Sequence, residues 1–300
     1  MKGDVIDGVK PATVVQMGEI TIEQLEAEVS KTREQHGDLL FQYHKIWYEA
    51  PYTWPYTHFL GIGMMKCPND LWSYQALMTR HRPKTIIETG TYQGASALWF
   101  AFLMDMLRIE GGKVITVDFE DHRIDPRIQH PRISFLAGNS VDPTLVAAIE
   151  EEVEGPVLVC LDSDHSSEHV RKELELYAPL CKVGDWLVVE DTNIGWTDGK
   201  EHVVTFKGDL GKCTCGMQFM SFLEDRKETV HPFIHKQATA GLPTVKCPHD
   251  KNDLGARGGL IDYMDKHPNE WKQDILSERY LLTMNPGGWL QRVAEYNHVA

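Results

Sequence analysis

Apolar and polar positions follow a regular order from residue 84 onward, where short β-branched apolar runs alternate with longer amphipathic segments. Such runs are typical of strands buried on both faces of a sheet. The predicted strands are Thr85–Glu88, Lys113–Asp118, Ile133–Ala137, Val157–Leu161 and Trp186–Glu190, with helices near 94–109, 142–153 and 166–178. This alternation predicts an α/β, Rossmann-like fold with a mostly parallel sheet, helices on both faces and a ligand crevice at the carboxyl ends of the strands.

The flanking segments follow other patterns. Residues 1–75 predict a helical or lid-like extension in which Thr21 caps a helix, and 76–195 form the core. Residues 196–255 read as an insertion with little periodicity beyond a possible short helix around Met217–Arg226. In 256–300 we expect a helix near 256–267, a strand over 279–285 and a turn at Pro286–Gly288, so that a C-terminal antiparallel hairpin completes the sheet.

The amino-acid composition and net charge limit the kinds of molecule that the protein is expected to bind. The chain has 300 residues, of which 42% are hydrophobic and 25% charged, as in an ordinary globular protein. A formal net charge of −14 argues against nucleic acid, so a small molecule or a cation fits better. Neither a membrane span nor a signal peptide is evident, hence the expected location is cytoplasmic, with the six cysteines reduced.

The predicted strands end in polar residues. These are Glu88, Asp118, Gly138-Asn139-Ser140, Asp162-Ser163-Asp164-His165 and Glu190-Asp191-Thr192-Asn193. Because the carboxyl ends of parallel strands meet at one edge, these groups are expected in a single crevice.

The first of these loops is rich in glycine. Gly90 and Gly94 would let a ligand approach the backbone, and the helix that follows offers free N–H groups to a phosphate or a carboxylate. A tight strand-to-helix turn without a ligand gives the same pattern. Tyr92 replaces the middle glycine of a dinucleotide fingerprint, which disfavours a pyrophosphate. Asp118 is suited either to a ribose or to capping the next turn.

Acidic residues dominate the last two strand ends. Several carboxylates in one crevice repel each other unless a cation lies between them, and oxygen ligands favour Mg²⁺. His165 lies beside them and is a candidate general base. Two structural alternatives stay open: Asp164 as the N-cap of the next helix, and His165 as a packing residue.

Six segments together resemble the cephalosporin hydroxylase (CmcI-like) and rhamnosyl O-methyltransferase family, whose members bind S-adenosylmethionine (SAM) and Mg²⁺. They are CPNDLWSYQALM, ETGTYQGASA, AGNSVDP, LDSDHSSEHVRKELELYAPL, VVEDTN and ERYLLTMNPGGWLQR, and they cover most of 59–195 and 256–300. The first glycine loop is also similar to that of catechol-type O-methyltransferases. The resemblance implies a class I SAM-dependent methyltransferase fold.

The same resemblance implies roles for individual residues. Cofactor contacts would be Glu88, Gly90, Thr91, Gly94, Ser96, Asp118, Asn139, Ser140 and Asp162. Metal ligands would come from Asp162, Asp164, Glu190 and Asp191, with the choice between Asp162 and Asp164 open. His165 and Asp164 would be the catalytic residues.

The insertion departs from the family pattern. It carries Cys213, Cys215, Cys247, His231, His235 and His249, whose irregular spacing makes a structural zinc site the lesser alternative to a cover over the acceptor pocket.

These observations predict a SAM- and Mg²⁺-dependent O-methyltransferase that acts on a hydroxyl, expected in a vicinal diol, of a sugar or natural product. The alternatives are a nicotinamide-dependent oxidoreductase and a non-catalytic SAM-binding protein that assists a hydroxylation. A homo-oligomer is also expected, from the family and from the aromatic extension.

Overall fold

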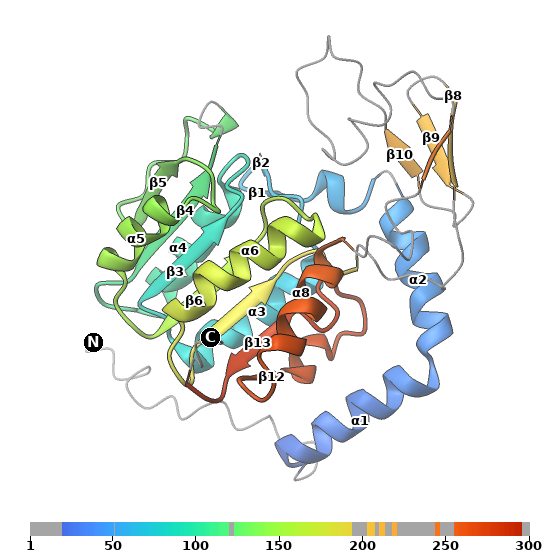
Figure 1. Ribbon diagram of the computed structural model, residues 1–300, viewed down its shortest axis with the longest axis horizontal. Coiled ribbons are helices and arrows are strands. Elements are labelled where there is room, and N and C mark those ends of the chain that lie inside the picture. The colour runs from blue at the N-terminus through green and yellow to red at the C-terminus, as the bar shows by residue number, and fades with distance from the viewer. Residues whose placement is uncertain are drawn as a thin grey trace, which may run out of the picture.

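The computed structural model describes residues 20–50, 52–119, 123–193 and 255–295, together with the backbone of 203–207, 210–213, 218–220 and 244–246. A seven-stranded sheet in the order β12-β13-β7-β6-β3-β4-β5 forms the centre (Figure 1). Its parallel strands are β3 (Thr85–Thr89), β4 (Lys113–Asp118), β5 (Ile133–Ala137), β6 (Val157–Leu161) and β7 (Trp186–Val189). The predicted Rossmann-like fold is confirmed, with strand bounds that agree to within one residue.

Helices cover both faces of the sheet. On one face lie α5 (Pro143–Glu152), α6 (Ser167–Tyr177) and α8 (Gly255–Lys266), against side chains such as Ile87 and Val159. On the other lie α3 (Pro68–His81) and α4 (Ala95–Met106), against Ile86 and Leu158. Neighbouring strand residues thus enter opposite cores, which is why the central strands β6 and β7 are apolar along their whole length.

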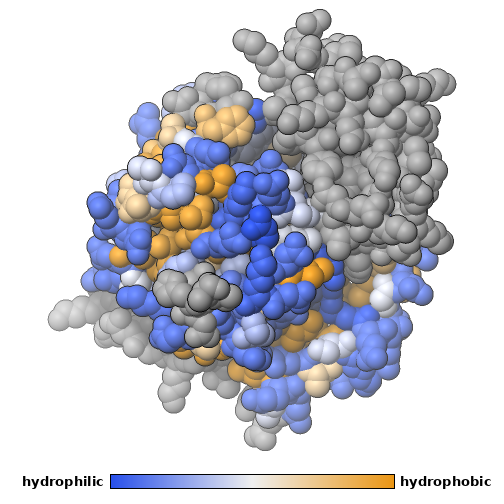
Figure 2. Space-filling view, viewed as in Figure 1, coloured by the Kyte–Doolittle hydropathy of each residue, from blue (hydrophilic) through white to orange (hydrophobic). Residues whose placement is uncertain are grey.

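Helix α6 has one apolar side, which packs against the sheet, and one charged side. Val170, Leu174 and Tyr177 are buried against the sheet. The ion pairs Lys172–Glu168 and Arg171–Glu175 lie on the solvent-accessible side of the helix, and the surface over α6 is largely hydrophilic (Figure 2). Ser166 caps the helix by accepting a hydrogen bond from His169 N. The loop before α6 is therefore fixed at a defined place on the strand edge.

The C-terminal part closes the sheet with antiparallel strands β13 (Trp289–Arg292), paired with β7, and β12 (Trp271–Gln273), paired with β13. The expected hairpin is confirmed, but the strand predicted over 279–285 is wrong. Residues 275–278 form a 3₁₀ helix (η4), and the turns that follow carry Leu281 at a positive φ of 67°. Backbone groups there bond elsewhere: Met284 N donates to Asp70 Oδ2, and Met284 O accepts from Asn193 N.

The N-terminal segment contains α1 (Ile22–Gln35), α2 (Gly37–Glu49), the 3₁₀ turn η1 (Trp54–Tyr56) and the short strands β1 (His58–Phe59) and β2 (Ile62–Gly63). The predicted cap at Thr21 is confirmed as a capping box with Gln24. Helix α3 runs through the boundary predicted at residue 76, so the end of the extension is part of the core packing.

The insertion contains β8 (Val203–Lys207), β9 (Leu210–Cys213), β10 (Gln218–Met220) and β11 (Thr244–Lys246) in the order β10-β9-β8-β11. The short helix predicted around Met217–Arg226 is therefore wrong over β10. The side chains proposed for zinc lie outside the described residues. Cys67, Cys160 and Cys181 are free thiols, as expected, and all three are buried. No helix in the described part of the chain is long and apolar enough to cross a bilayer.

Candidate active site

The ends of β3, β6 and β7 are joined by backbone hydrogen bonds that continue the sheet beyond the strands. Asp162 N donates to Thr89 O at 3.1 Å, and Glu190 N donates to Leu161 O at 2.9 Å. Asp162 and Glu190 therefore occupy neighbouring positions at the carboxyl edge, as the sequence predicted.

Three side chains meet at this edge. His165 Nε2 lies 3.1 Å from Asp191 Oδ2 and 4.0 Å from Asp162 Oδ1. One ligand atom from each of Asp162, His165 and Asp191 lies within 4.8 Å of the other two. All three residues are partly accessible, with side chains 16–23% exposed. Two carboxylates and an imidazole in this arrangement can hold a divalent cation.

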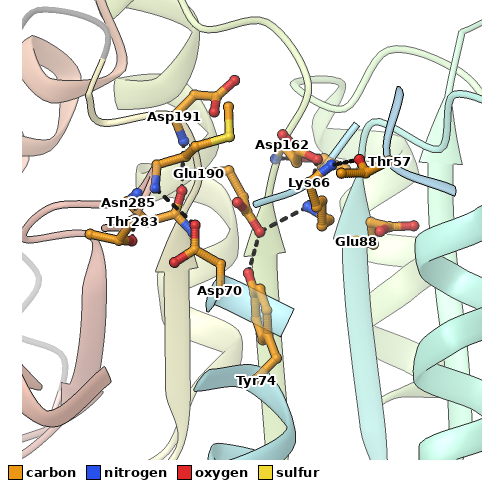
Figure 3. Close-up of polar contacts among 12 residues, drawn as sticks. Thr57, Lys66, Asp70, Tyr74, Glu88, Asp162, Glu190, Asp191, Thr283 and Asn285 are labelled. Carbon is orange, nitrogen blue, oxygen red and sulfur yellow. Dashed lines mark hydrogen bonds and ion pairs between the residues drawn. The ribbon is translucent and has the colours of Figure 1, made fainter. Parts of the chain in front are cut away.

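A buried lysine lies beside this group. Lys66 Nζ donates to Asp162 Oδ2 at 2.8 Å and to Glu190 Oε1 at 2.9 Å, and Tyr74 OH also donates to Glu190 Oε1 (Figure 3). Lys66 is only 3% exposed and Glu190 4%. Sequence reasoning missed both Lys66 and Tyr74. Lys66 stands in the segment MMKCPND, where a single lysine gives no sign of partners that are 96 and 124 residues away.

The charges at this edge are unequal. Burial raises the pKa of Asp162 to about 7, with contributions from Glu190 and Asp191 and with Lys66 acting in the opposite sense. Burial also raises the pKa of Asp191, opposed by His165. Burial also tends to raise the pKa of Glu190, but the charge of Lys66 and the hydrogen bonds from Lys66, Tyr74 and Asn285 together lower it. Lys66 thus favours the charged form of Glu190, whereas burial and neighbouring carboxylates oppose the charged forms of Asp162 and Asp191, which a bound cation would stabilise.

Asp164 has a local role. Its Oδ1 accepts from Ser166 N at 2.8 Å, which closes a turn before α6. The alternative that Asp164 is the N-cap is wrong, since Ser166 takes that place. Asp164 also lies outside the group formed by Asp162, His165 and Asp191.

The glycine loop after β3 is shaped by the backbone of its neighbour. Gly90 has a φ of +86°, and a Cβ at this position would lie 1.9 Å from the carbonyl oxygen of Asp162. Gly90 therefore allows the β3 and β6 loops to touch. The loop is further fixed by Tyr92 N, which donates to Asp118 Oδ2 at 2.9 Å while Tyr92 adopts a φ of 49°.

Glu88 lies beneath this loop in a buried chain of polar groups. Thr116 Oγ1 donates to Glu88 Oε2 at 2.7 Å and lies 2.7 Å from Thr91 Oγ1. Burial raises the pKa of Glu88, with Lys66 opposing. Glu88 Oε1 is buried without a hydrogen-bond partner in the described part of the chain. Such an oxygen is suited to accept a hydrogen bond from a bound amino group.

The remaining predicted contacts lie on the β5 side. Ser140 is buried, and its Oγ is 3.0 Å from His169 Nε2, whereas Asn139 is exposed and accepts from Val141 N. Ser96 is buried in the first turn of α4, directly after Gly94. The structure thus places the predicted cofactor residues at β3, β4, β5 and the start of α4, except for Asp162, which lies with the acidic group at β6 and β7.

Comparison with known proteins identifies the family of the chain. The family model for rhamnosyl O-methyltransferase/CmcI matches residues 52–211, which include Lys66, the glycine loop and both acidic strand ends. The chain belongs to this family.

The chain is also similar to the rhamnosyl O-methyltransferase of Mycobacterium bovis, to which it is 40% identical over 157 residues, which are 51% of this chain and 63% of that protein. The Mycobacterium leprae protein of the same name is 36% identical over 156 residues, 51% of this chain and 67% of its own. The matched part is therefore about two thirds of these relatives.

Solved structures of CmcI share the fold. An apo form aligns with a TM-score of 0.51 and 19% identity, covering 80% of this chain and 77% of CmcI. A form described as carrying Mg and SAM gives 0.50 and 19%, covering 80% and 78%.

Proposed function

We propose that this protein is an O-methyltransferase that transfers the methyl group of SAM to a sugar hydroxyl with the help of Mg²⁺. The observation that carries the proposal is the group of Asp162, His165 and Asp191, which adjoins the glycine loop in a member of the rhamnosyl O-methyltransferase/CmcI family. The names of the relatives support both the reaction and a rhamnosyl acceptor.

The residues on the β3 side fit the methyl donor. The unpartnered Glu88 Oε1 would accept from its amino group, and the α4 N-terminus at Gly94 and Ser96 would face its carboxylate. Asp118 would hold the ribose, and Asn139 and Ser140 would border the adenine. Gly90 and Thr91 would shape the pocket by holding the loop in place.

The residues on the β6 and β7 side fit a hard divalent cation. When bound, it would lower the pKa of the acceptor hydroxyl and neutralise charge that develops on its oxygen. Asp162 and Asp191 are the proposed ligands, because both carboxylates converge on one place. Asp164 is less suited to bind the cation, because its Oδ1 already accepts a hydrogen bond in the turn before α6. Glu190 is also less suited, because its Oε1 already accepts hydrogen bonds from Lys66 and Tyr74.

His165 is the proposed base. Its Nε2 would take the proton of the acceptor hydroxyl as the new O–CH₃ bond forms and the S–CH₃ bond breaks. Asp191 Oδ2, 3.1 Å from this nitrogen, would stabilise the imidazolium that results. A vicinal diol would present two oxygens to this edge, so that one is held while the other reacts.

The direct test is transfer of a tritiated methyl group from SAM to para-nitrophenyl α-L-rhamnopyranoside. We expect a methylated sugar with Mg²⁺, loss of product in EDTA, and recovery when Mg²⁺ is restored. Asp162→Asn should reduce the rate at least about a hundredfold, and Asp262→Asn, on the exposed side of α8, should leave it unchanged. Failure of the wild-type protein to label this rhamnoside would overturn the rhamnosyl acceptor.

A further inference from the structure

Three aromatic rings of the N-terminal segment form a stacked column. His44 and Tyr48 lie one turn apart on α2, with ring centroids 5.8 Å apart and planes inclined by 19°. Tyr48 stacks in turn on Trp54, at 5.2 Å and 22°. The Trp54 indole N–H donates to the carbonyl of Tyr48 at 2.9 Å, so the chain after α2 folds back onto the column. The position of Tyr48 is thus fixed by two stacked neighbours.

The column is attached to the acidic edge at two places. His44 Nε2 lies 3.1 Å from the amide nitrogen of Asn193, two residues after Asp191. Beyond Trp54, Thr57 Oγ1 accepts from Lys66 N at 3.1 Å, and Lys66 reaches Asp162. Tyr48 thus belongs to a group of rings that is joined to the strand edge through His44 and Asn193, and through Thr57 and Lys66.

Two polar groups at this place lack partners. The half-buried Tyr48 hydroxyl has no hydrogen bond to any residue that the structure describes. Asn193 is 4% exposed, and its Oδ1 is likewise without a partner among those residues. Buried tyrosine hydroxyls normally have a partner, and a donor and an acceptor left unmatched on an aromatic surface are typical of a binding site.

The ring column lies on the side of the acidic group that is away from the proposed methyl-donor site. The proposed cofactor contacts lie on β3, β4 and β5, while Asn193 follows β7, on the opposite side of the acidic group. An acceptor that reaches Asp162 and Asp191 from the side away from the methyl donor therefore meets α2.

We infer that Tyr48 is an acceptor-recognition residue whose hydroxyl donates to a sugar hydroxyl while the ring column borders the apolar face of the pyranose. This inference rests on the proposed function and extends it to α2. A sugar suits both features, because its hydroxyls donate and accept while its C–H groups pack on aromatic rings. Tyr48→Phe removes only the phenolic oxygen and retains the column.

The test compares Tyr48→Phe with Tyr43→Phe, a matched loss of a hydroxyl at an exposed position of the same helix. Binding of para-nitrophenyl α-L-rhamnopyranoside is measured by NMR titration with Mg²⁺ and S-adenosylhomocysteine present, and binding of SAM is measured separately by calorimetry. We expect Tyr48→Phe to raise the Kd for the rhamnoside about fivefold, as for loss of one hydrogen bond, with the Kd for SAM unchanged. Tyr43→Phe should change neither.

Equal rhamnoside affinity in Tyr48→Phe and the wild type would overturn the inference, as would a wild-type protein that binds SAM but no rhamnoside. Weaker SAM binding in Tyr48→Phe would also overturn it, because the residue would then act on the donor side. Failure of the wild type to bind SAM would instead remove the proposed function itself.

Discussion

The Lys66 ammonium lies between two carboxylates, 2.8 Å from Asp162 Oδ2 and 2.9 Å from Glu190 Oε1. It brings a positive charge from the N-terminal segment to the carboxyl edge of the sheet. Lys66 can therefore offset the repulsion between Asp162 and Glu190, and it fixes the directions of Asp162 Oδ2 and Glu190 Oε1.

Replacement of Lys66 tests this relationship. Lys66→Met leaves Glu190 buried and Asp162 mostly buried without a counter-charge, so we expect a loss of about 3 kcal/mol in the free energy of unfolding. Lys84→Met is the control, because Lys84 is 46% exposed and lies 3.9 Å from Glu154. Urea denaturation measures both. Equal stabilities of the two variants would show that Lys66 does not compensate the carboxylates.

Gly90 should be far less replaceable than another glycine of similar conformation. Gly90→Ala strains a φ of +86° and drives a Cβ into the Asp162 carbonyl, whereas Gly184 has a φ of +97° with no atom within 4 Å. We expect Gly184→Ala to cost about 1 kcal/mol and Gly90→Ala at least about 3 kcal/mol, from backbone strain and overpacking. Thermal unfolding of the two variants gives the comparison, and similar losses would mean that the loops separate easily.

Asp70 should make stability fall as pH rises. It is 1% exposed, its Oδ2 accepts from Met284 N, and burial raises its pKa to about 8. Since the unfolded chain releases this proton near its ordinary pKa, the native state binds more protons, and stability decreases with pH between about 4 and 8, by up to about 1.4 kcal/mol per pH unit from this group.

Asp70→Asn removes this titration. The stability difference between the variant and the wild type, from urea unfolding at several pH values, should rise in favour of Asn as the pH increases from 5 to 8. Asp262→Asn, at an exposed site, should show a constant difference. A constant difference for Asp70→Asn as well would mean that the buried carboxyl is ionised throughout.

The choice between Asp162 and Asp164 can be decided by Mn²⁺ binding, followed by electron paramagnetic resonance. Asp162→Asn and Asp191→Asn should each weaken binding at least about tenfold, because each removes a converging charge. Asp164→Asn should stay within about twofold, since an asparagine oxygen can still accept from Ser166 N. A loss confined to Asp164→Asn would reverse the assignment.

The sequence predicted the regular part of the fold well, and for a physical reason. Strands such as Val157–Leu161 are buried on both faces, so the pattern of apolar residues follows the structure directly. The segment 279–285 imitates a strand, with Leu281, Leu282 and Met284, but its residues fill irregular positions and its backbone bonds to the side chain of Asp70. The order of apolar and polar residues within 279–285 gives no information about a hydrogen-bond partner as distant in the sequence as Asp70.

The site was predictable where it followed the strands and not where it depended on distant segments. Asp162, His165 and Asp191 stand at strand ends, where topology alone brings them together. Lys66 and Tyr74 come from the N-terminal segment, whose aromatic and proline-rich sequence indicates only an ordered loop or lid. Their contacts with the carboxyl edge depend on how that segment packs, which no spacing in the sequence reveals.

The most direct test of the central claim is calorimetric titration of the protein with SAM, and separately with NAD⁺, each with and without Mg²⁺. The account predicts saturable binding of SAM, weakened in Asp118→Ala, and no binding of NAD⁺. Absence of SAM binding under every condition, or binding of NAD⁺ in its place, would contradict the assignment as a methyltransferase.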